Sequence, residues 1–132
     1  MVTSCIAQVE NLVINDLNFR TFLQENYPQI FINDSILDIN SCDNITSIDC
    51  SSSEISSLDG IKYFENLTYL NCSYNQITQL PELPSNLYSL NTSHCVNLIT
   101  IESFPNGLEF IDCSYNQIIT LPDLPSNLKH LY

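Results

Sequence analysis

The residues best suited to chemistry are six cysteines and two histidines. His94 and Cys95 are adjacent, and in a cysteine hydrolase these residue types serve as general base and nucleophile. A working dyad needs the two side chains within hydrogen-bond reach. Neighbouring residues on an extended strand point to opposite faces. We therefore expect His94 to be exposed, Cys95 to be buried, and the pair to form no dyad.

The other cysteines follow a repeat. Cys50, Cys72 and Cys113 share one repeat position, and Thr92 occupies it in a further copy. We expect free thiols packed as small hydrophobic side chains, although a disulfide between Cys50 and Cys72 is geometrically conceivable. The sequence has no C-x-x-C motif and too few histidines for a convincing zinc site, so we expect no metal. Free thiols suit a reducing compartment, which predicts a cytoplasmic protein, or a secreted one if a leader had been removed.

Motifs for other chemistry are missing. Only Gly60 and Gly107 are available, too few for a phosphate-binding loop. The stretch NDSILD lacks the order of a calcium loop, and no serine-nucleophile motif occurs. We predict no enzyme activity, no catalytic residues and no cofactor. If the chain is a fragment, a catalytic domain would lie beyond Tyr132.

The charge balance narrows the class of partner. The chain has 15 Asp and Glu against three basic residues, for a net charge of −12. Phosphate binding needs clustered basic side chains, whereas Arg20, Lys62 and Lys129 are scattered. We expect no direct binding to nucleic acid or to a membrane surface, and no apolar run is long enough to span a bilayer. A protein with a basic surface is the natural complement, although the acidity alone would also favour solubility.

Self-similar units must position these residues. Units begin at Ile45, Leu67, Leu87, Leu108 and Leu128, which are 22, 20, 21 and 20 residues apart. The second and fourth units share CSYNQI and LPSNL, which chance does not explain. Alternating apolar residues in each unit predict a short strand with one buried face. Strands of successive turns would stack in parallel about 4.8 Å apart.

These units resemble the leucine-rich-repeat family, whose consensus is L-x-x-L-x-L-x-x-N/C-x-L. The second unit matches it with Leu67, Leu70, Cys72, Asn75 and Ile77. The stretches LPELPSNL and LPDLPSNL look like the short bacterial subclass found in type III secretion effectors. This resemblance implies an α/β solenoid: a right-handed coil with a parallel concave sheet and an extended, polyproline-like convex side.

We expect one domain, made of an N-terminal helical cap over residues 1–44, four repeats over 45–127 and a partial fifth repeat over 128–132. The cap more loosely resembles that of Bacteroidetes repeat proteins. Asp16 should cap a helix that Pro28 ends, and a second helix should cover Ile36–Cys42, capped by Asn33 or Asp34. At the other end, LKHLY closes the stack, its edge strand pairs with another copy, or the chain is truncated.

The strand residues between the inward positions would face the concave side. Stacking should bring Tyr69, Tyr88 and Phe110 into proximity and align a polar row of Asp and Asn. Aromatic rings among polar side chains are typical of protein-binding faces, although aromatic residues also cover sheets well. The predicted protein-binding residues are Asp49, Tyr69, Asn71, Tyr74, Tyr88, Asn91, His94, Phe110, Asp112 and Tyr115.

Two functions fit these features. The family resemblance implies a non-catalytic protein–protein recognition module that binds through its concave face, such as an adaptor or an effector. The alternative is a small acidic stoichiometric inhibitor, a nucleic-acid mimic of the anti-defence type in bacteria or phages. It would block the basic groove of a nucleic-acid enzyme.

Overall fold

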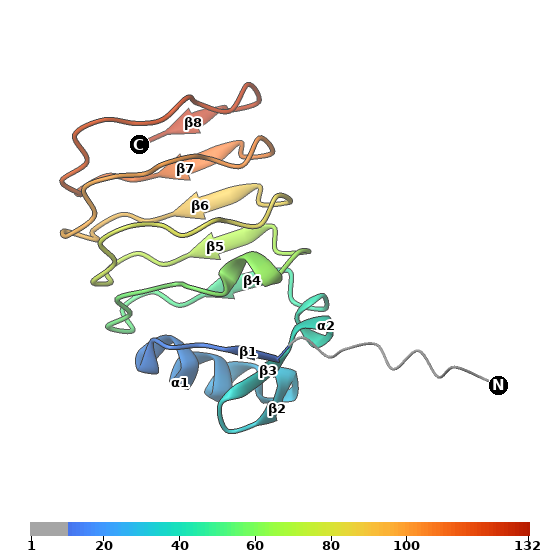
Figure 1. The fold of residues 1–132 in the computed structure, drawn as a ribbon. Helices are drawn as coiled ribbons and strands as arrows, with labels where there is room; N and C mark the ends of the chain where they lie inside the picture. The colour runs from blue at the N-terminus through green and yellow to red at the C-terminus, as the bar shows by residue number, and fades with distance from the viewer. Residues whose placement is uncertain (1–10) are drawn as a thin grey trace.

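The computed structural model describes residues 11–132. The first ten residues of the predicted cap, which include Cys5, lie outside the described residues. The rest forms two parts: a small N-terminal unit, and a stack of turns whose strands lie one above another (Figure 1). Within residues 11–132, the structure has no helix with the length and hydrophobicity that a bilayer crossing requires.

The stack is organised by a five-stranded parallel sheet in which each strand pairs with the next one along the chain. Every strand is short, and each turn of about twenty residues returns the backbone to the same sheet. This is the strand-per-repeat arrangement of a leucine-rich-repeat-like fold. The strands are β4 (Ser47–Asp49), β5 (Tyr69–Asn71), β6 (Ser89–Asn91), β7 (Phe110–Asp112) and β8 (His130–Leu131).

The central residue of each of the strands β4 to β7 points into the core. Ile48, Leu70, Leu90 and Ile111 are in register with one another and at most 1% exposed. Burying a side chain of this size contributes roughly 1.5–3 kcal/mol. Because side chains alternate along a strand, the residues on either side of each central position face away from the core.

The cysteine position forms a second inward column, as predicted. The Cys50 N–H donates to the carbonyl of Asn71, and the Cys72 N–H donates to that of Asn91, which keeps successive turns in register. Cys50 and Cys72 are fully buried, whereas Cys113 is half-buried near the end of the stack. All five cysteines within residues 11–132 are free thiols, so Cys50 and Cys72 form no disulfide.

Asn75 turns inward and bonds the backbone of two turns. Its Nδ2 donates to the carbonyls of Cys50 and Cys72, and its Oδ1 accepts from the N–H groups of Ser53 and Ile55. These backbone groups lie where the chain leaves the strands and lack sheet partners. A buried backbone group without a partner costs free energy, so this buried amide stabilises the bend.

The extra residue of the third unit changes this arrangement. Cys95 takes the asparagine position, and its Sγ lies 3.3 Å from the carbonyl of Cys72. Asn116 in the next turn donates Nδ2 to the carbonyls of Thr92 and Cys113, but its buried Oδ1 has no hydrogen-bond partner among the described residues. The longer bend before Leu98 therefore satisfies the next asparagine only in part.

The return segments differ between the first turn and the later ones. A 3-10 helix, η2 (Ile61–Tyr63), lies in the first return, whereas residues 76–86, 96–107 and 117–127 contain no helix. Prolines at 81, 84, 105, 122 and 125 lie in these later returns, where their missing N–H groups break no strand ladder. The sequence predicted an extended convex side throughout and did not predict the helix η2.

Gly60 introduces η2 with φ of +100°, a region that favours glycine. A Cβ at this position would lie 2.6 Å from Cδ1 of Ile14, in the N-terminal unit. Any side chain at this position would require Ile14 to shift, so glycine lets the backbone of the first turn pack closely against that unit.

Asp16 joins the N-terminal unit to the stack. Its Oδ1 accepts from the N–H of Phe19 and caps helix α1 (Leu17–Asn26), as predicted. Its Oδ2 accepts from the N–H groups of Ser56 and Ser57 in the first turn. One carboxylate thus stabilises the start of the helix and holds it against the repeats.

The expected second helix is confirmed only in its second part. Strand β3 (Ile36–Asp38) occupies its first half, and only α2 (Ile39–Cys42) is helical, capped by Asp38. β3 is the middle strand of a three-stranded antiparallel sheet, between β1 (Asn11–Val13) and β2 (Phe31–Asn33).

Asn33 does not cap a helix. Its Oδ1 accepts from the N–H groups of Ser35 and Ile36 and closes the tight turn between β2 and β3. Asn and Asp at positions 33 and 34 are typical turn residues, and they mark a hairpin at this point. The N-terminal unit therefore combines helices with a sheet rather than being purely helical.

Candidate protein-binding surface

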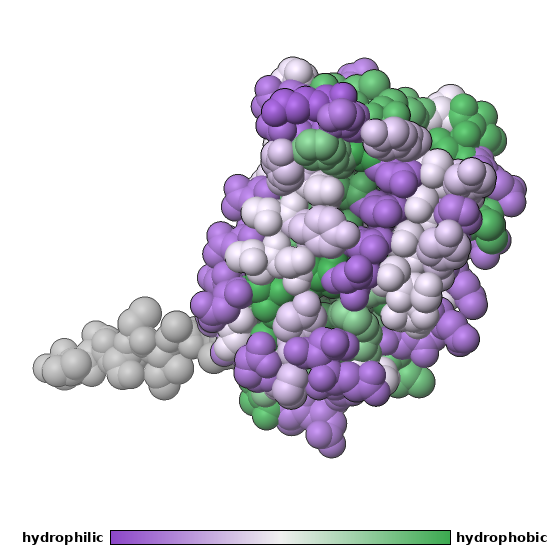
Figure 2. All heavy atoms as spheres, turned by 180° about the vertical axis from the view of Figure 1, so that it is seen from behind, coloured by the Kyte–Doolittle hydropathy of each residue, from purple (hydrophilic) through white to green (hydrophobic). Residues whose placement is uncertain are grey.

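The outer face of the parallel sheet points away from the core and is the face that the sequence predicted to be concave. It carries three columns of side chains. Figure 2, which views the molecule from behind, shows residues of like hydropathy aligned along the stack. The strand column comprises Ser47, Tyr69, Ser89, Phe110 and His130. The polar row comprises Asp49, Asn71, Asn91 and Asp112. The loop column comprises Tyr74, His94 and Tyr115, in the bends just after the strands.

The polar row shapes the bends that follow the strands. Each member accepts through Oδ1 from the N–H of the residue two positions later, as Asn91 does from Ser93 and Asp112 from Ser114. This is a local Asx turn. Part of the hydrogen-bonding capacity of the row is therefore used to hold the backbone.

Asp49 and Asn71 are also bonded to each other, with Asn71 Nδ2 3.1 Å from Asp49 Oδ2. Burial alone would raise the pKa of Asp49, but hydrogen bonds from Ser51 and Asn71 outweigh it and hold that pKa below its ordinary value. Asp49 therefore presents a stable negative charge at neutral pH.

The loop column is a stack of three rings. Tyr74, His94 and Tyr115 all have φ near +57°, and this left-handed backbone turns each side chain onto the same side of the bend. The ring centroids of successive members lie 4.3 Å apart. Tyr74 and Tyr115 are 58% and 73% exposed, so the column presents a broad aromatic surface to solvent.

The rings on the strands, and Tyr88 just before β6, cluster towards β7 and β8. Tyr88 lies against Phe110, with centroids 5.2 Å apart, and Phe110 stacks on His130 at 4.8 Å. Tyr69 makes no ring contact with either predicted partner within residues 11–132, because its register partner on β6 is the small Ser89. The expected grouping of Tyr69, Tyr88 and Phe110 thus holds only for the last two.

A hollow of about 210 Å³ opens on the outer face between Tyr69 and Phe110. Ser89 and the buried Leu90 form its base, and members of the polar row line one side. Its remaining wall comes from Tyr132, whose ring is 68% exposed. The set of predicted binding residues did not include Ser89, His130 or Tyr132, although the repeat spacing already places Ser89 and His130 on this face.

Each basic side chain in the described part of the chain already forms an ion pair or a hydrogen bond within the protein. Lys129 Nζ lies 2.6 Å from Glu109 on the outer face, and Lys62 lies 3.1 Å from Glu82. Arg20 donates to the carbonyl of Ile14. The hydrogen bond from Lys129 is the main reason why the pKa of Glu109 lies below its ordinary value. The charge left unpaired is therefore negative.

The cysteines provide no reactive thiol in the core. Burial raises the pKa of Cys50 to about 12 and raises that of Cys72 well above its ordinary value. Thiolates, not thiols, are the nucleophiles. His94 is half-exposed while Cys95 is buried, as expected for neighbours on opposite faces. No cluster of metal-binding side chains occurs within residues 11–132.

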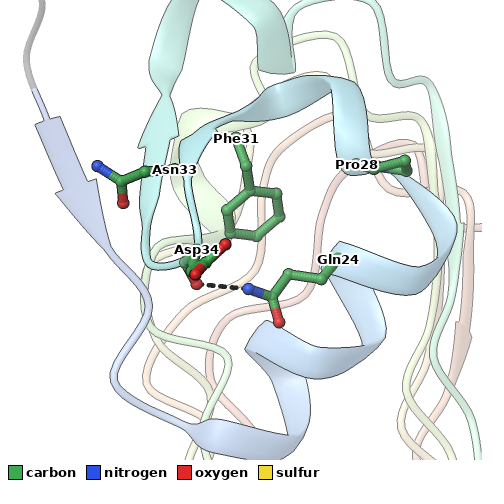
Figure 3. Close-up of a pocket in the computed structure, with 5 residues that line it drawn as sticks. All are labelled: Gln24, Pro28, Phe31, Asn33 and Asp34. Atoms are coloured by element: carbon green, nitrogen blue, oxygen red, sulfur yellow. Dashed lines mark hydrogen bonds between the residues drawn. The ribbon is translucent and has the colours of Figure 1, made fainter.

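A larger hollow, of about 630 Å³, lies in the N-terminal unit between α1 and the β2–β3 turn (Figure 3). Phe31 and Pro28 line it, and Gln24 donates to the backbone carbonyl of Asp34 across one side. Its one ionisable side chain is the Asp34 carboxylate. With no second charged or nucleophilic group beside that carboxylate, this hollow is a weaker candidate than the outer face.

Solved structures that are similar to this chain include two leucine-rich-repeat proteins. A Shigella effector leucine-rich-repeat domain is 31% identical, with 70% of this chain and 51% of that chain covered and a TM-score of 0.48. An internalin from Listeria monocytogenes is 12% identical, with 90% and 56% covered and a TM-score of 0.48. The chain spans about half the length of these proteins. No family model matches the sequence, and no curated protein does.

Proposed function

We propose that this chain is a leucine-rich-repeat recognition module that binds a partner protein through the outer face of its parallel sheet, without catalysis. The main support is the gathering of exposed rings on that face. Tyr69, Tyr88 and Tyr74 are 38%, 43% and 58% exposed, although each is a large side chain that gains free energy on burial. Rings held by short strands offer contact area at low conformational cost.

The proposed partner has a basic surface. Asp49 and Asp112 flank the rings as charged members of the polar row, and the described basic side chains are paired or bonded elsewhere. Opposite charge on a partner accelerates encounter and orients it. The same charge repels nucleic acid, so a DNA duplex should not bind.

The test is affinity capture from lysate of the source cells with the wild type and a face variant carrying Tyr69→Ala, Tyr88→Ala and Phe110→Ala. The matched control carries Val96→Ala, Ile99→Ala and Ile119→Ala, which remove exposed apolar side chains from the bend and return segments. We expect the face variant to lose the proteins that the wild type and the control both retain. Equal capture by the two variants would place the binding surface elsewhere.

A further inference from the structure

One position of the strand column, between two aromatic residues, carries no ring. Rings occupy the column at Tyr69 on β5 and at Phe110 on β7, while Ser89 on β6 lies between them in register. Two strand spacings separate Tyr69 from Phe110, or roughly 9–10 Å along the sheet. Two stacked rings in this column are 4.8 Å apart, as Phe110 and His130 are. The gap above Ser89 therefore has the thickness of one further planar group.

The hollow is polar along one side. Asp112 Oδ1 accepts from the N–H and the hydroxyl of Ser114, whereas Asp112 Oδ2 has no hydrogen-bond donor or ion-pair partner among residues 11–132. Asn91 lies beside it in the polar row, and its Oδ1 is used by Ser93. Asp112, which lines the hollow between Tyr69 and Phe110, thus has one carboxylate oxygen without a donor from the described part of the chain.

We propose that this hollow binds an arginine side chain of the partner protein. The guanidinium is planar, so it stacks between Tyr69 and Phe110 as a further ring in the column would. It donates to the carboxylate of Asp112 at the same time. A lysine ammonium is a compact, strongly hydrated charge that pairs with the carboxylate but does not fill a flat slot. This inference rests on the proposed function, because it assigns the central contact of the same face.

Two substitutions test the slot against a matched control. Ser89→Tyr places a ring at the position on β6 that carries none, and this ring fills the hollow. Ile119→Tyr adds the same ring at an exposed position on a return segment, away from the outer face. Asp112→Asn removes the charge but keeps the bend, since Asn91 makes the same turn with Ser93.

The probe is a fluorescein-labelled peptide of alternating arginine and serine, compared with the matching lysine peptide at equal charge. Fluorescence anisotropy measures binding, and amide NMR shifts of the full chain show where the peptide contacts it and that each variant is folded. We expect the arginine peptide to bind at least about tenfold more tightly than the lysine peptide, a preference worth about 1.4 kcal/mol. Ser89→Tyr and Asp112→Asn should each weaken it to a similar extent, and Ile119→Tyr should not.

The outcomes separate this inference from the proposed function. If both peptides bind the outer face equally, or if folded Ser89→Tyr binds arginine as well as the wild type does, the arginine slot is wrong while the surface assignment stands. If neither peptide shifts amides of the outer face, the slot is wrong and the proposed basic partner loses its support as well.

Discussion

The imidazole of His94 lies parallel to the ring of Tyr74, with centroids 4.3 Å apart and an angle of 11° between the planes. Tyr115 covers the opposite face of the imidazole at the same distance. The three residues come from successive turns, so the stack links three repeats at their bends. The aromatic surface proposed for binding is therefore also a structural element of the stacked turns.

Replacing His94 by alanine should cost about 1–2 kcal/mol of stability, because each aromatic pair contributes roughly 0.5–1.5 kcal/mol. His94→Tyr should cost much less, since Tyr74 and Tyr115 already place tyrosine in the same backbone conformation. Urea unfolding monitored by circular dichroism measures both variants. A tyrosine variant as unstable as the alanine variant would show that the stacking contributes little.

Asn75 and Asn116 occupy one repeat position but should differ in importance. Asn75→Ala leaves the buried N–H of Ile55 and neighbouring backbone groups without partners, and each such group costs about 1–3 kcal/mol. We expect a loss of roughly 3 kcal/mol or more in the free energy of unfolding. Asn116 makes bonds only through Nδ2, so Asn116→Ala should cost clearly less. Equal losses in urea titrations of the two variants would contradict this.

The thiols should react in a fixed order. Burial raises the pKa of Cys50 and of Cys42 to about 12, so almost no thiolate is present at pH 8. Cys113 is half-buried and its pKa is raised less far. We expect iodoacetamide to label Cys113 well before Cys50 or Cys72 in the native protein. Mass spectrometry of peptides gives the order of labelling. A Cys5→Ser background leaves only the five cysteines within residues 11–132 to react. Early labelling of Cys72 would indicate local opening of the core.

The Glu109–Lys129 pair should make the outer face sensitive to acid. Because the hydrogen bond from Lys129 lowers the pKa of Glu109 in the folded protein, the stabilisation is present above the unfolded pKa and is lost as pH falls through the folded pKa. We expect Lys129→Ala to raise the Glu109 pKa towards its ordinary value, as followed by carboxyl NMR. The difference in stability between the two proteins should vanish at low pH, and a constant difference would show that the pair acts through packing alone.

The sequence alone determined the features that depend on local pattern. Alternation within each unit placed Leu70 inward and Tyr69 outward, because side chains on a strand must alternate. The spacing of the units placed Cys50 above Cys72, and the residue type of Asp16 predicted a helix cap. These results need only a few neighbouring residues and the assumption that each turn repeats the last.

The tertiary structure alone decided the contacts between distant segments. The segment Ile36–Asp38 is a strand because β1 and β2 pair with it on both sides, and pairing across the chain outweighs local helical preference. The spacing of the units already placed Ser89 between Tyr69 and Phe110, but the hollow also needs Tyr132 from the last turn as a wall, and only the structure shows that contact. One added residue in the third bend left Asn116 Oδ1 without a partner. In each case the energy comes from contacts that form only when separate turns meet.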